Sequence, residues 1–193
     1  FGRYSLDEDG LIYAGGEWDS SRYETFKPDD NNVIPVLAAE WFEDDAVSLL
    51  RHWLSVVYGK ETLEENLRFI EDALGKDIRS YMARDFYEDH IKVYQNRPIY
   101  WMFSSTGDYK GSFKALIYLH RYTPATLNNI LNGYVRELQA KLKAEITQQQ
   151  RISQTAEGPV KNKANKMIDT LRQQVSELED YERNVLYPLV SRN

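Results

Sequence analysis

The chain has 193 residues, of which 42% are hydrophobic, so it can bury a core and is not wholly disordered. It has no cysteine, which excludes a cysteine-ligated metal site and fits a reducing compartment, and no apolar run of membrane-spanning length; we expect a cytoplasmic protein with no membrane partner. The formal net charge of −6 makes the whole chain a poor electrostatic match for DNA. The chain opens with Phe1, and we expect it to be a piece of a longer protein.

The first third of the chain predicts loops followed by helices. Residues 1–32 are rich in Gly, Asp, Ser and Asn and are expected to form loops with one short strand. Apolar residues recurring every three to four positions predict three helices, at residues 41–58, 62–74 and 77–94. Glu43, Asp44 and Asp45 are expected in the first helical turn, where the helix dipole favours negative charge; a metal site is the alternative.

An aromatic stretch follows, at residues 97–122. Seven of its 26 residues are Tyr, Trp or Phe and four are Arg or Lys, so it resembles a stacking platform for nucleic acid. It also reads as two β-favouring runs around a Gly-containing turn, which predicts a β-hairpin. Strand alternation places Tyr100 and Met102 on one face and Trp101 and Phe103 on the other. Both faces are apolar, so we expect both to be covered by protein, with Trp101 and Phe103 buried.

The last third predicts two long helices. Thr123 is an expected N-cap, with Pro124 at the first helical position. A heptad-like repeat of apolar residues then runs through two segments joined by a turn at Gly158-Pro159, which predicts an antiparallel helical hairpin with arms of about 28 residues, or about 42 Å. Val185 is expected on the seam, and Pro188 is expected to break the second helix.

The fold class predicted by these elements is mainly α (α+β). A helical domain at residues 1–122 has an N-terminal loop region and an aromatic β-hairpin at about 97–122. A long antiparallel helical hairpin follows at residues 123–193. The histidines lie far apart in the sequence with no metal-ligand spacing, and no nucleophile motif is present, so no catalytic, cofactor-binding or metal-binding residue is assigned.

Positive charge gathers near the predicted hairpin turn. Six basic residues stand against Glu145 and Glu157, a balance of +4 in a chain of net charge −6. These six are the candidate DNA-phosphate contacts: Lys141, Lys143, Arg151, Lys161, Lys163 and Lys166. The alternative interpretation is an ordinary solvated helix face.

Several stretches resemble one protein family, in order along essentially the whole chain. They include "FGRYSLDEDGLIYAGGEWD", "LEENLRFIEDALG", "DFYEDHIKVYQNRPIYWMFSS", "GSFKALIYLHRY" and "YERNVLYPL". The chain resembles the C-terminal region of the adenine-specific DNA methyltransferases of BREX phage-defence systems, the PglX family, which is related to type IIG restriction-modification methylases.

The resemblance implies a parent enzyme that methylates adenine N6 in a short DNA site with S-adenosylmethionine. The family's catalytic N-P-P-Y signature is absent, since the chain contains no Pro-Pro pair, so the resemblance carries over no catalytic residue and no cofactor site. It implies a non-catalytic segment that scaffolds or completes DNA target recognition beside the rest of the methyltransferase chain. The alternative is a protein-interaction module that docks other components of the defence complex.

Overall fold

A computed structural model describes residues 5–6, 12–13, 31–95 and 97–192. The short strands β1 (Ser5–Leu6) and β2 (Ile12–Tyr13) pair antiparallel, where the sequence predicted one strand. The other strands are β3 (Ile34–Pro35), β4 (Tyr100–Ser104) and β5 (Lys114–Tyr118). The α-helices are α1 (Ala46–Tyr58), α2 (Leu63–Leu74), α3 (Ile78–Arg84), α4 (Phe86–Val93), α5 (Pro124–Asn129), α6 (Arg136–Thr155), α7 (Gly158–Tyr181) and α8 (Tyr187–Val190). The mainly α fold class with some β structure is confirmed.

The predicted β-hairpin is present and belongs to a three-stranded antiparallel sheet. The strand order is β3–β5–β4, with Trp101 opposite Ile117 and Ile34 opposite Leu116. The third strand was not predicted, because β3 has two residues, one of them Pro35, and so carries no alternating pattern.

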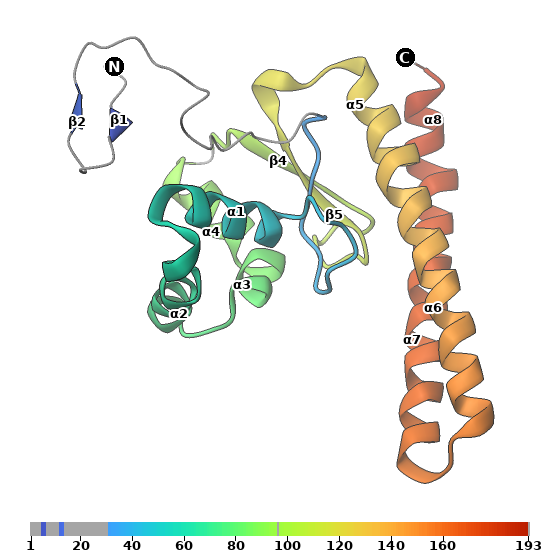
Figure 1. Cartoon of the computed structure of the whole chain (residues 1–193). Coiled ribbons are helices and arrows are strands. Elements are labelled where there is room, and N and C mark those ends of the chain that lie inside the picture. The colour runs from blue at the N-terminus through green and yellow to red at the C-terminus, as the bar shows by residue number, and fades with distance from the viewer. Residues whose placement is uncertain (1–4, 7–11, 14–30, 96, 193) are drawn as a thin grey trace.

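Helices cover both faces of this sheet. On one face Met102 and Leu116 pack in a cluster with Tyr87 of α4, and α1, α3 and α4 lie on this side (Figure 1). On the other face Phe113 and Ile117 join the largest core cluster, most of which comes from α5, α6, α7 and the turns between them. That cluster crosses the predicted domain boundary after residue 122, because its members come from both sides of it.

The prediction that Trp101 is buried was wrong. Trp101 points to the face covered by the long helices, yet its side chain is 56% exposed, while Phe103 is partly buried against the main core. Ile117, directly opposite Trp101, is fully buried, so the long helices cover the central strand β5 and leave this position of the edge strand β4 open.

The first helix begins later than predicted. It starts at Ala46, and Asp45 is its N-cap, accepting a hydrogen bond from the Ser48 N–H at 2.8 Å. The Asp45 carboxylate is almost fully buried and forms an ion pair of 2.5 Å with Arg79 of α3. None of the three acidic residues lies inside the helix, so the prediction that they complement its dipole from the first turn was wrong.

The third predicted helix is two helices. The chain bends at Asp85, between α3 and α4. The bend places α4 along β4, where the His90 Nε2 accepts the Tyr100 backbone N–H at 3.2 Å. A side chain of α4 thus satisfies a backbone donor of the edge strand, a group that otherwise exposes a sheet to unwanted pairing.

The last third forms the predicted antiparallel hairpin. Thr123 and Thr126 form a reciprocal cap around Pro124, and helical structure runs continuously from 124 to 155 and from 158 to 190. Each of the two long helices contains a π-helical turn, at Ile130–Val135 and Glu182–Leu186. The turn between them lies at residues 156–157, just before the predicted position.

Two predictions at the end of the second long helix were wrong. Pro188 does not break the helix, because it lies in the first turn of α8 directly after a π-helical turn. Leu186 occupies the seam and is fully buried, while Val185 is exposed. A π-helical turn holds more residues than an α-turn, so it rotates the following side chains by one position.

No helix in the part of the chain that the structure describes is long and apolar enough to cross a membrane.

Candidate nucleic-acid interface

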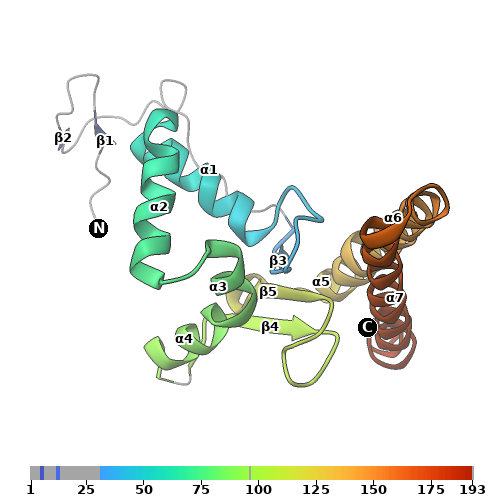
Figure 2. The same cartoon turned by 90° about the horizontal axis from the view of Figure 1, so that it is seen from below.

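We call the described residues 31–122 the body, and residues 144–174 of α6 and α7 the arm. Figures 1 and 2 show the two long helices running beside the body, and Figure 1 shows the arm continuing past it. Three polar contacts fix the helices to the body where they lie against it.

The first contact joins Tyr134 to the segment before α1. The Tyr134 hydroxyl donates to the Asp44 carboxylate at 2.6 Å and accepts from the Asn31 side-chain amide at 2.6 Å. The Tyr134 ring is buried, with its centroid 5.2 Å from that of Phe42. Asp44 therefore anchors the long helices to the body.

The second contact uses Lys141, one of the six candidate phosphate ligands. Its ammonium donates to the Trp41 carbonyl oxygen at 2.6 Å, pairs with Glu137 at 2.7 Å, and lies 4.4 Å from the Phe42 ring centroid. The Lys141 ammonium therefore already has a carbonyl, a carboxylate and an aromatic face as partners. Its contacts hold α6 against the body.

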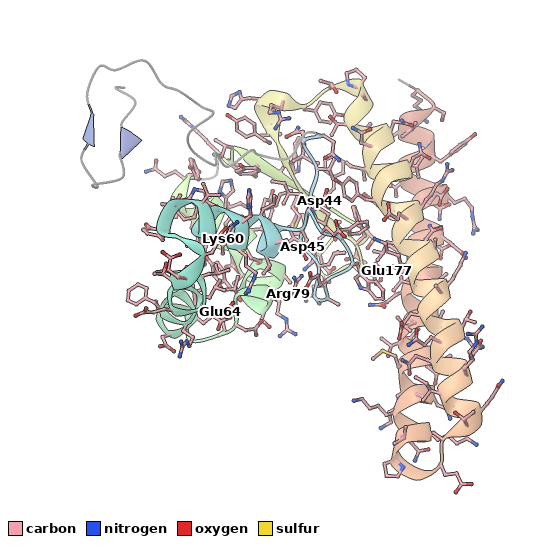
Figure 3. The ribbon with its side chains drawn as sticks, viewed as in Figure 1. Asp44, Asp45, Lys60, Glu64, Arg79 and Glu177 are labelled. Carbon is pink, nitrogen blue, oxygen red and sulfur yellow. The ribbon has the colours of Figure 1, made fainter. Side chains whose placement is uncertain are left out.

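The third contact joins Glu177 of α7 to the loop between β4 and β5, and Figure 3 labels Glu177 at the level of the body. One carboxylate oxygen accepts the Ser112 N–H at 2.7 Å, the other accepts the Ser112 hydroxyl at 2.8 Å, and Ser105 donates its hydroxyl to the first. The loop folds tightly at Gly111, where a Cβ would lie 2.8 Å from the Thr106 backbone nitrogen. Charged acceptors make the stronger hydrogen bonds in proteins, so this contact holds α7 firmly.

The structure divides the six candidate cations into two groups. Lys141 is engaged as described, and Lys143 pairs with Glu179 of the opposite helix at 2.7 Å. The other four are exposed and form no ion pair within residues 5–6, 12–13, 31–95 and 97–192: Arg151, Lys161, Lys163 and Lys166.

The four unpaired cations lie on the part of the hairpin that projects. Lys166 is 11 residues from Glu177 along α7 and Lys163 is 14 residues away, so they stand about 16 Å and about 21 Å beyond the Glu177 contact with the body. Cations held away from the body in this way can approach an anion without desolvating any other group.

Two titratable groups buried in the body have structural roles. Lys114 of β5 donates to the Ala83 carbonyl oxygen at the end of α3, and burial, together with the nearby Arg84, lowers its pKa. Burial also lowers the pKa of His90, which fits its role as a neutral acceptor for Tyr100. Among the described residues no group of three or more His, Asp or Glu could hold a metal ion.

One cavity of about 430 Å³ lies between α1, the α3–α4 bend and the sheet. Its lining includes Leu50, Trp53, Phe86 and Tyr100, with Arg121 as the charged member. Among the described residues that line it there is no carboxylate.

The chain is similar to two adenine-specific methyltransferases. It is 40% identical over 196 residues to PglX of Lacticaseibacillus casei (strain Zhang), a match that covers 96% of this chain and 16% of the relative. It is 37% identical over 201 residues to BrxX of Escherichia coli O9:H4 (strain HS), covering 94% of this chain and 16% of the relative. The chain is homologous to one segment of these methyltransferases. No family model matches it.

The match to PglX and BrxX confirms the resemblance seen in the sequence. The chain spans about a sixth of the length of these relatives, at 16% of each.

The sequence did not indicate a role for Glu177, because it is one of several acidic residues of α7 and its partners lie 65 and 72 positions away. The sequence does contain a pattern that indicates which side of the first long helix faces the body. Tyr134 and Lys141 are seven residues apart and therefore lie on the same side of that helix.

Proposed function

We propose that this chain is a non-catalytic segment of an N6-adenine DNA methyltransferase of a cytoplasmic phage-defence system. In this proposal the parent enzyme binds S-adenosylmethionine and carries out methyl transfer elsewhere in its chain. This segment scaffolds or completes DNA target recognition, and its arm touches the DNA backbone. The observation that carries the proposal is an arm anchored to the body by Asp44, Lys141 and Glu177, on which four of the six candidate cations are exposed and form no ion pair among the described residues.

Backbone contacts suit such an arm. Phosphate contacts supply affinity and fix the orientation of a protein on a duplex, and they carry no base information. A rigid arm is better suited to this task than a loop, because its cations lie at fixed positions relative to the rest of the enzyme. The acidic remainder of the chain would at the same time disfavour DNA binding to other surfaces.

The test is charge reversal in the full-length enzyme. Replacing Arg151, Lys161, Lys163 and Lys166 by Glu should weaken binding to target and non-target duplexes alike, with a shallower dependence of affinity on salt. A control enzyme with Arg68→Glu and Lys92→Glu, exposed cations of α2 and α4, should bind DNA like the parent. Unchanged affinity and unchanged salt dependence in the fourfold variant would refute the phosphate contact.

A second candidate function is docking of other proteins of the defence complex. The exposed Trp101 on β4 favours it, because tryptophan is enriched at the centres of protein interfaces and costs energy when left in water. In this case Trp101→Ala would weaken association with the other defence proteins and leave DNA affinity unchanged. A full-length Trp101→Ala enzyme that assembles normally would count against this function.

A further inference from the structure

The four unpaired candidate cations, which are Arg151, Lys161, Lys163 and Lys166, do not share one side of the arm. An α-helix turns by about 100° per residue, so Lys161 and Lys163, two positions apart on α7, point in directions that differ by about 160–200°. One straight duplex cannot contact both. The arm therefore has two candidate sides, and the contacts of α7 with the body distinguish them.

Glu177 marks the side of α7 that faces the body loop, since its carboxylate holds Ser105 and Ser112. Lys163 is 14 residues from Glu177, or two heptads, and Lys166 is 11 residues away. Both therefore lie within about 40° of the Glu177 direction. The line that contacts the body at Glu177 continues along the arm through these two lysines.

This line is free of carboxylates between Glu177 and the hairpin turn. The residues that fall within about 60° of it are neutral or basic. They are Gln174, Gln173, Thr170, Lys166, Lys163, Asn162 and Pro159. Amide and hydroxyl side chains also donate hydrogen bonds to phosphate oxygens, so the whole line suits a polyanion.

The opposite side of α7 carries a matched pair of cations. Lys161 and Arg172 lie about 140–160° from Glu177 and within about 20° of each other. Both are exposed and form no ion pair in the described part of the chain. Like Lys163 and Lys166, they are positively charged residues of α7, but they face the opposite direction.

On α6 the side of Lys141 carries one carboxylate within the arm, at Glu145. Its oxygen accepts the Gln149 side-chain amide at 2.8 Å. Gln148 and Thr155, which lie seven and fourteen residues after Lys141 on the same side, are neutral. The balance of this side of the arm remains positive.

We propose that the duplex lies along the body-facing side of the arm, in the angle between arm and body. Lys163 and Lys166 then contact backbone phosphates, while Lys161 and Arg172 face solvent. This inference rests on the proposed function and specifies which surface performs it. Contacts from one side only would also fix the direction in which the duplex leaves the body.

The experiment compares two double variants of the full-length enzyme, Lys163→Glu with Lys166→Glu and Lys161→Glu with Arg172→Glu. Each is titrated with a duplex that contains the methylation target and one that lacks it, at several salt concentrations, after thermal unfolding shows that both variants keep the parent fold. The Lys163/Lys166 variant should bind both duplexes about tenfold more weakly and reduce the magnitude of the salt slope by about two. The Lys161/Arg172 variant should change affinity less than twofold.

Two outcomes overturn the inference in different ways. An equal or larger loss in the Lys161/Arg172 variant shows that DNA uses the other side or both sides, and leaves the proposed function standing. No loss in either variant, together with no loss in the fourfold variant, refutes the proposed function as well. Loss of association with a defence protein in the Lys163/Lys166 variant, with DNA affinity unchanged, assigns this side to a protein partner instead.

Discussion

The Glu177 carboxylate accepts two hydrogen bonds from Ser112, one with each oxygen: 2.7 Å from the backbone N–H and 2.8 Å from the hydroxyl. The pair joins α7 to the loop between β4 and β5, across 65 positions of sequence. Together with Tyr134–Asp44 it sets the angle at which the arm leaves the body. Truncating Glu177 tests how much this anchor contributes.

Replacing Glu177 with Ala should lower the free energy of unfolding by about 1.5–3 kcal/mol, because the Ser112 N–H and two hydroxyls lose a charged acceptor. Asp169→Ala is the matched control: this carboxylate is exposed on the same helix without an ion pair in the described region, and its loss should change stability by less than about 0.5 kcal/mol. Urea unfolding measures both. Equal effects would show that the anchor contributes no net stability.

Truncation of two adjacent residues of β4 should lower stability by very different amounts. Met102 is buried between the sheet and α4, so Met102→Ala should cost about 2–5 kcal/mol. Trp101 is 56% exposed, and Trp101→Ala should cost less than about 1 kcal/mol. Thermal or urea unfolding of the two variants measures the two losses of stability. A larger loss for Trp101→Ala would mean that the side chain is covered in solution.

Lys141 should behave as a stabilising residue. Lys141→Met keeps the alkyl chain and removes the ammonium that binds the Trp41 carbonyl, so the free energy of unfolding should fall by about 1–2 kcal/mol. Lys163→Met, at an exposed position with no ion pair in the described residues, should leave stability unchanged. If both variants unfold at the same urea concentration as the parent, the contact with Trp41 carries no net energy.

The parts of the fold that sequence predicted are those governed by local rules. The cap at Thr123 and Pro124 and the heptad spacing of the long helices depend on residues within a few positions of each other, and both are present in the structure. The alternation of Tyr100 and Met102 against Trp101 and Phe103 was also read correctly, since a strand has a fixed period of two.

The parts that sequence missed depend on contacts between distant segments. Trp101 is exposed because the long helices do not extend over this position of the sheet. The residues near Trp101 in the sequence do not indicate how far those helices reach. The bend at Asp85 interrupts a regular apolar period, and its consequence is the hydrogen bond between α4 and Tyr100. The π-helical turn before Pro188 likewise changes the phase of a repeat that the sequence alone continues smoothly.

The same distinction applies to the candidate interface. Counting charges located the basic residues near the hairpin turn, but partners far along the chain decide which of them are unpaired. Lys141 is satisfied by Trp41, 100 positions away, and Lys143 by Glu179, 36 positions away. The direction that Lys163 faces relative to the body follows only once the contact of Glu177 with Ser112 is known.

The pH dependence of stability should carry a contribution from His90. Burial holds the folded-state pKa of His90 below its ordinary value of 6.5, so below that pH the unfolded chain binds a proton that the folded chain does not. Stability should therefore fall as the pH drops from about 6.5 toward the folded pKa, and should level off below it. Protonation of Nε2 would also remove the acceptor of the Tyr100 N–H.

The variant His90→Gln tests this contribution, because glutamine retains a hydrogen-bond acceptor and cannot titrate. Its free energy of unfolding, measured by urea between pH 7.5 and 5, should decline less steeply than that of the parent. Parallel curves for the two proteins would show that His90 is charged as readily in the folded chain as in the unfolded one.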